Sequence, residues 1–93
     1  MKKIVILGTG IMAVGIAAGF LANGHSVILL GRSKERAESQ IGEIAQVTKE
    51  INPNWTQETC PIIAGSIDDW NDWQDVIWVI ETIKEDMALK QAL

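Results

Sequence analysis

The most constraining feature of this sequence is a short glycine-containing segment between two apolar segments near the start of the chain. Residues 3–7 read Lys-Ile-Val-Ile-Leu, which predicts a buried strand. The next residues, ahead of an apolar helix pattern, are Gly8, Thr9, Gly10, Ile11, Met12 and Ala13, with the spacing G-x-G-x-x-A. In such a unit the glycines permit a tight turn and close approach of a phosphate, and the last small residue packs the helix on the strand. We therefore predict that these six residues bind the pyrophosphate of a dinucleotide at the positive end of the helix dipole.

Predicted strands and helices alternate along the rest of the chain, which is typical of a parallel sheet. The expected strands cover residues 3–7, 26–30, 62–64 and 76–80. The expected helices cover residues 11–22, 34–50 and 84–93, with a loop at 51–61 and a turn at 68–75. This β-α-β-α-β-β-α order predicts a partial α/β fold of the Rossmann-like, doubly wound type. Right-handed crossovers give the spatial strand order 3-2-1-4.

The apolar pattern also predicts which faces are buried. Residues 26–30 are apolar without alternation, as expected for a strand covered on both faces. In the first helix a face of small residues predicts close packing on the sheet, and it is formed by Gly15, Gly19 and Ala22. In the second helix the predicted buried face is formed by Ala37, Ile41, Ile44 and Thr48.

The tryptophans receive different predictions. We expect Trp70 and Trp73, three residues apart, to hold the turn at 68–75 against the core. Trp78 falls within an apolar strand and is predicted to be a core residue. Trp55 falls in the predicted loop and has no role that the sequence indicates.

Composition excludes several classes of function. The net charge is −4 and no cluster of Lys and Arg is present, which argues against a nucleic-acid partner. The single cysteine, Cys60, rules out an internal disulfide and a cysteine-based metal site. An acidic group at residues 68–75 lacks the spacing of a calcium loop, so no metal ligand is predicted. The glycines within residues 4–22 and the second strand that follows argue against a membrane span or export signal, and we expect a cytoplasmic protein.

The fourth strand, at residues 76–80, is expected at an open and apolar edge of the sheet. Such edges tend to pair with another chain. We therefore expect a homo-oligomer, or a partner chain that covers this edge.

Three segments resemble the 3-hydroxyacyl-CoA dehydrogenase family. Residues 6–17 resemble the opening of the family, including Met12, and residues 23–27 resemble its G-H-x-V turn into the second strand. The most specific likeness is at residues 79–90, which resemble the family segment V-I-E-A-x-x-E-x-x-x-x-K. The resemblance covers the whole chain, but only the first third of a typical member. It implies an incomplete dinucleotide-binding domain over residues 1–93.

The resemblance implies NAD as cofactor and, in a complete enzyme, oxidation of a 3-hydroxyacyl-CoA. It makes Ile83, Glu85 and Lys90 cofactor-binding residues. The catalytic His–Glu pair and the helical C-terminal domain of the family come later in the family sequence, and no segment here matches them. His25, the one histidine, matches the turn before the second strand and is interpreted as structural. No catalytic residue is therefore predicted, and whether this chain acts as an enzyme stays open.

The end of the second predicted strand bears on cofactor choice. NAD-binding units carry an acidic residue there, about 20 residues after the glycines, which binds the adenosine ribose. This chain has Gly31, followed by Arg32 and Ser33. Gly31 removes a charge that would repel a 2′-phosphate, Arg32 is suited to bind that phosphate, and Ser33, also the predicted N-cap of the second helix, adds a hydroxyl. The residues thus favour NADP and the family favours NAD.

Other functions remain open at this point. The Gly31-Arg32 pair is also similar to ketopantoate reductases, which use NADP, although the segment at residues 79–90 does not fit that family. A non-catalytic module that binds a nucleotide or assembles with a partner is the alternative from another class. A remnant that folds but binds nothing is the third.

Overall fold

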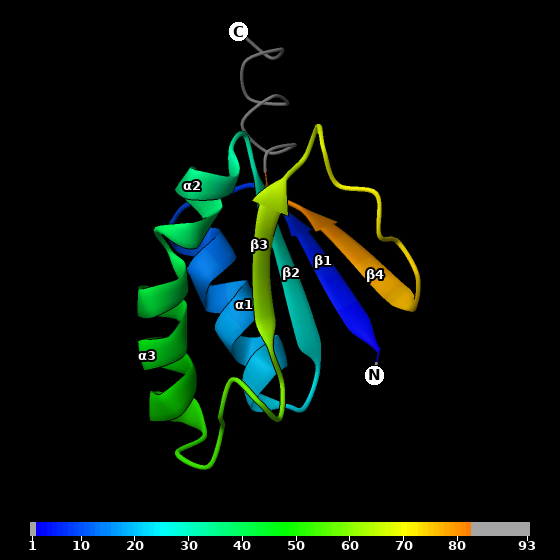
Figure 1. Cartoon of the computed structure of the whole chain (residues 1–93). Coiled ribbons are helices and arrows are strands. Elements are labelled where there is room, and N and C mark those ends of the chain that lie inside the picture. Colours follow the sequence, from blue (N-terminus) through cyan, green and yellow to red (C-terminus); the bar gives the residue numbers. More distant parts are fainter. Residues whose placement is uncertain (1, 83–93) are drawn as a thin grey trace, which may run out of the picture.

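A parallel four-stranded sheet organises the molecule (Figure 1). The computed structural model describes residues 2–82. The strands are β1 (Lys3–Leu7), β2 (Ser26–Gly31), β3 (Ile62–Ser66) and β4 (Val76–Glu81). Their spatial order is β3-β2-β1-β4, so the predicted Rossmann-like fold and strand order are confirmed. Three strands run one or two residues further than predicted, and the predicted helix at 84–93 lies outside the described residues.

The helices α1 (Ile11–Ala22), α2 (Lys34–Glu38) and α3 (Ile41–Ile51) lie together on one side of the sheet (Figure 1). The prediction of one helix over residues 34–50 is wrong, because the chain breaks the helix at Ser39 and Gln40. At the break the Ser39 hydroxyl donates to the Arg36 carbonyl at 2.7 Å. The apolar spacing continues through the break and therefore gives no sign of it.

No helix within residues 2–82 is long and apolar enough to cross a membrane.

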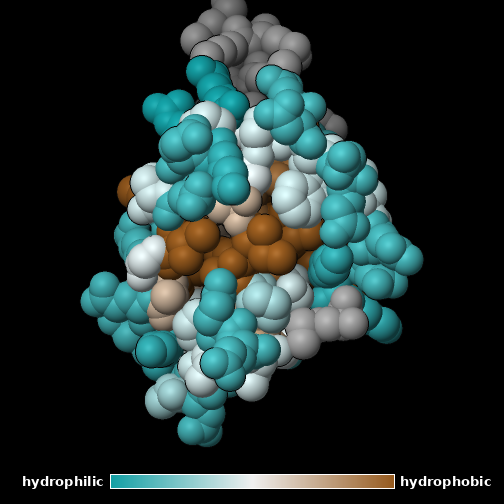
Figure 2. Space-filling model, viewed as in Figure 1, coloured by the Kyte–Doolittle hydropathy of each residue, from teal (hydrophilic) through white to brown (hydrophobic). Residues whose placement is uncertain are grey.

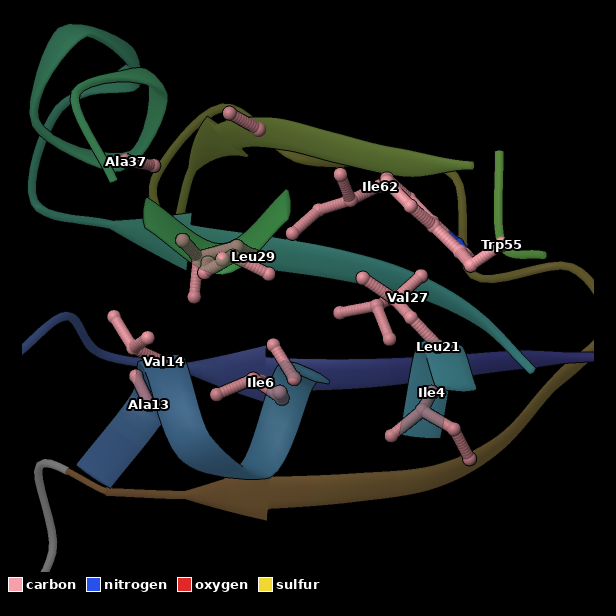
Figure 3. Packing of buried hydrophobic residues seen from close by; sticks show 13 residues of the cluster. Ile4, Ile6, Ala13, Val14, Leu21, Val27, Leu29, Ala37, Trp55 and Ile62 are labelled. Atoms are coloured by element: carbon pink, nitrogen blue, oxygen red, sulfur yellow. The ribbon is translucent and has the colours of Figure 1, made fainter. Parts of the chain in front are cut away.

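The main core fills the space between the sheet and these helices (Figure 3). The predicted buried face of α2 and α3 is confirmed, since Ala37, Ile44 and Thr48 are fully buried and Ile41 is partly buried. Every residue of β2 is buried, as predicted for a strand covered on both faces. These burials remove apolar surface from water and so stabilise the fold.

The small-residue face of α1 does not pack on the sheet as predicted. Gly15 is exposed, and a β-carbon built on it or on Gly19 would have no atom of the described residues within 4 Å, apart from the backbone of α1 itself. The buried face of α1 is formed instead by Ala13, Val14, Ala17, Ala18 and Leu21. Alanines are small enough for a close approach to the sheet and have a higher helix propensity than glycine.

A smaller cluster covers the other face of the sheet. Val5, Ile28 and Leu30 are fully buried there beneath Trp70 and other residues of the segment between β3 and β4. The Trp70 indole N–H donates to the Asp72 carbonyl at 2.8 Å, so the predicted role of Trp70 is confirmed. In the view of Figure 2, hydrophobic side chains gather in the middle of the molecule and hydrophilic ones surround them.

The predictions for the other tryptophans are wrong. Trp73 is 46% exposed and does not hold the turn, and Trp78 is 60% exposed and is not a core residue. Trp78 lies on β4, an edge strand that pairs only with β1 among the described residues. Its ring and that of Phe20 are inclined to each other by 62°, with their centroids 6.2 Å apart. Trp55, by contrast, is buried, and its indole N–H donates to the Cys60 carbonyl at 3.0 Å.

Replacing Trp55 by alanine tests whether this loop residue belongs to the core. We expect Trp55→Ala to lower the free energy of unfolding by about 3–5 kcal/mol, because it leaves a cavity and an unpaired carbonyl. Trp73→Ala, at an exposed site, is the matched control and should change it by less than about 0.5 kcal/mol. Equal effects of the two substitutions in urea denaturation would contradict the assignment of Trp55 to the core.

Candidate functional site

The candidate site begins with the turn that joins β1 to α1. Gly8 and Gly10 both have positive φ, 116° and 118°, a conformation that favours glycine. The Gly8 N–H donates to the Leu30 carbonyl at 2.7 Å, which fastens the turn to the carboxyl end of β2. Gly10 is the N-cap residue of α1, and its carbonyl accepts the N–H of Val14 at 3.1 Å. The predicted strand, glycine turn and helix are therefore confirmed as local structure.

The first turn of α1 is open to an anion. Within residues 2–82 no side chain caps the helix start, and the first turn of α1 carries no acidic residue. Ile11 is 91% exposed and Met12 is 53% exposed, whereas Ala13 is buried against the core. The first N–H groups of a helix have no partner within the helix, and its dipole attracts negative charge. The backbone therefore offers the donors that a pyrophosphate requires.

A contact that the sequence did not predict joins the turn to the break between α2 and α3. The Gly10 N–H donates to the Gln40 side-chain carbonyl at 3.0 Å. This backbone donor of the turn thus already binds an oxygen from outside its own helix. The spacing gave no sign of Gln40, because the residue fell inside a predicted continuous helix.

The end of β2 lies against the same turn. A β-carbon built on the buried Gly31 would lie 3.0 Å from the Thr9 methyl carbon. Arg32 follows at an exposed position. The Ser33 hydroxyl accepts the Arg36 N–H at 3.2 Å, which confirms Ser33 as the N-cap of α2. That hydroxyl still has a hydrogen to donate to a ligand.

The end of β4 borders the turn from the other side. The N–H and the hydroxyl of Thr82 both donate to the Leu7 carbonyl, each at 2.9 Å. The turn therefore lies between the carboxyl ends of β2 and β4, where the strand order reverses. Open α/β sheets bind ligands at this place.

The structure thus brings the predicted residues 8–13 and 31–33 together at the carboxyl ends of the strands. Ile83, Glu85 and Lys90 lie outside the described residues. His25 lies at the opposite, amino-terminal end of the strands, just before β2, where its ring and that of Phe20 form a T-shaped pair with a centroid distance of 5.8 Å. Its Nδ1 is buried and has no hydrogen-bond partner among the described residues.

Fold and site together define a dinucleotide-binding domain of the Rossmann type. The family model for the NAD-binding domain of 3-hydroxyacyl-CoA dehydrogenase matches residues 3–93, and the chain belongs to this family. No solved structure matches the chain significantly.

Among curated relatives, the chain is 30% identical over 99 residues to a glyoxysomal fatty acid beta-oxidation multifunctional protein, MFP-a, of Brassica napus. It is 29% identical over 104 residues to the mitochondrial hydroxyacyl-coenzyme A dehydrogenase of Sus scrofa. Both alignments cover the whole chain, but only 14% of the first protein and 33% of the second. The chain therefore matches between one seventh and one third of the length of these relatives.

Substitution of Gly10 tests whether the turn binds the pyrophosphate as predicted. Gly10→Ala should lower the free energy of unfolding by about 1–3 kcal/mol, because the backbone at φ 118° and ψ −174° is strained for any residue with a β-carbon. It should also abolish dinucleotide binding, measured by energy transfer from tryptophan to the reduced nicotinamide.

Gly15→Ala is the matched control for Gly10→Ala. Gly15 lies within α1, and a β-carbon there meets no atom from the rest of residues 2–82 within 4 Å. The substitution should raise the free energy of unfolding by about 0.5–1 kcal/mol and leave binding unchanged. Unchanged binding by the Gly10→Ala variant would show that the turn is not the phosphate site.

Proposed function

We propose that the chain holds a nicotinamide dinucleotide for hydride transfer from a 3-hydroxyacyl-CoA to the oxidised nicotinamide, or in reverse from the reduced nicotinamide to the 3-ketoacyl-CoA. The observation that carries the proposal is the start of α1, which no side chain of residues 2–82 caps and which lies beside two glycines of positive φ. These features supply backbone donors and a favourable dipole for a pyrophosphate. The fatty acid substrate class rests on the relatives, whose names describe beta-oxidation and hydroxyacyl-coenzyme A dehydrogenase proteins.

We further propose that the preferred dinucleotide is NADP, although the family description names NAD. Position 31, at the end of β2, carries no carboxylate to accept hydrogen bonds from ribose hydroxyls or to repel a 2′-phosphate. The neighbouring Arg32 is exposed, and a guanidinium is suited to bind a phosphate through paired hydrogen bonds. Ser33 offers a hydroxyl hydrogen next to it.

Titration with NADPH and NADH tests the cofactor preference. Arg32→Ala should weaken NADPH binding about 10-fold, because it removes a charged hydrogen bond, and should change NADH binding by less than about 3-fold. Lys49→Ala is the control, because it removes the same charge at an exposed residue away from the candidate site. Lys49 lies in the last turn of α3, whereas Gln40, which contacts the glycine turn, lies at the start of that helix. Equal loss of both cofactors in the Arg32 variant would refute the role of Arg32.

A chimaera tests the hydride-transfer proposal. In this chimaera, the present chain replaces the matched 33% of the Sus scrofa relative, and the remaining part of that relative is unchanged. We expect the chimaera to oxidise NADPH in the presence of acetoacetyl-CoA, followed by absorbance at 340 nm. The same chimaera with Gly10→Ala should show no turnover. A folded chimaera that binds NADPH without turnover would instead favour a nucleotide-binding module.

A further inference from the structure

Position 31 is enclosed by its neighbours. A β-carbon built there would lie 3.0 Å from the Thr9 methyl, 3.4 Å from the Ser33 carbonyl oxygen and 3.6 Å from the Ala37 nitrogen. The last two distances are ordinary contacts, whereas the first is tighter than most contacts of a real β-carbon. Gly31 lies in strand β2 and lacks a positive φ, so its backbone conformation suits any residue. The obstacle to a side chain at position 31 is therefore the methyl group of Thr9.

This methyl group has little freedom to move away. Threonine is branched at its β-carbon, which restricts rotation about χ1. Hydrogen bonds also hold the backbone on either side of Thr9. The Gly8 N–H donates to the Leu30 carbonyl, and the Gly10 N–H donates to the side-chain carbonyl of Gln40. A side chain at position 31 must therefore displace Thr9, whose position is held by these hydrogen bonds.

We propose that Thr9 is a positioning residue for cofactor choice and acts through position 31. Its methyl group disfavours any side chain at position 31, including a carboxylate that would enter the site for the adenosine ribose. A carboxylate there would accept hydrogen bonds from the ribose hydroxyls of NAD and repel the 2′-phosphate of NADP. The proposal rests on the proposed dinucleotide function, and it predicts that Gly31→Asp alone does not create an NAD site.

A stability cycle tests the steric part without any ligand. Gly31→Ala adds only a β-carbon and should lower the Tm of the full chain by about 5 °C, as expected for a small overpacked site. In the background of Thr9→Ser, which removes only the methyl group, the same change should lower the Tm by less than about 2 °C. Thr9→Val keeps a methyl group there and should not relieve the loss. Additive effects of Thr9→Ser and Gly31→Ala would overturn the steric part.

Binding of NADH and NADPH, read by tryptophan energy transfer, tests the choice of cofactor. Gly31→Asp alone should bind both at least 10-fold more weakly than the parent chain. Thr9→Ser with Gly31→Asp should regain NADH binding at least 10-fold and prefer NADH to NADPH. Thr9→Val with Gly31→Asp should regain neither. Strong NADH binding by Gly31→Asp alone, or equal rescue by serine and valine, would overturn the role of Thr9.

The outcomes separate this inference from the function on which it rests. A parent chain that binds neither dinucleotide would refute the proposed function and, with it, any role of Thr9 in cofactor choice. The Tm cycle would still decide whether the Thr9 methyl excludes side chains from position 31. A parent chain that binds NADPH, with no difference between the serine and valine backgrounds, would refute the inference alone.

Discussion

The position of β1 in the middle of the sheet is the constraint on which the rest of the molecule depends. β1 pairs in parallel with β2 on one side and with β4 on the other. Its carboxyl end therefore opens between two other strand ends, and the chain must turn there to enter α1. Buried β1 residues on both faces, such as Ile4 and Val5, fix this central strand within both cores.

The turn itself is held by parts of the chain that are distant in sequence. Leu30 accepts the Gly8 N–H, Gln40 accepts the Gly10 N–H, and Thr82 donates twice to Leu7. Together these contacts hold the start of α1 and leave its first turn exposed. An anion site built from backbone donors needs this kind of support, since donors held in place lose little freedom on binding.

Most of the fold was predictable because the apolar segments are long and their periods are distinct. The four strands, α1, the buried face of α2 and α3, and the strand order followed from pattern and handedness. The predictions were wrong where burial depends on tertiary neighbours, which the hydrophobic pattern of the sequence does not specify. Trp78 is apolar in an apolar strand but lies at an edge, and Trp55 lies in a loop but packs into the core. The break in the helix at Ser39 and Gln40 preserves the helical spacing of apolar residues, so the sequence pattern did not predict it.

The sequence by itself determined the glycine turn, its place before a helix and the absence of an acidic residue at position 31. These are local properties, because each depends on residue type and spacing. Only the tertiary structure decided that Thr9 lies against Gly31 and that Gln40 reaches Gly10, across 22 and 30 positions of the sequence. Such contacts depend on how the strands twist and how α2 ends, and no short-range pattern encodes that geometry.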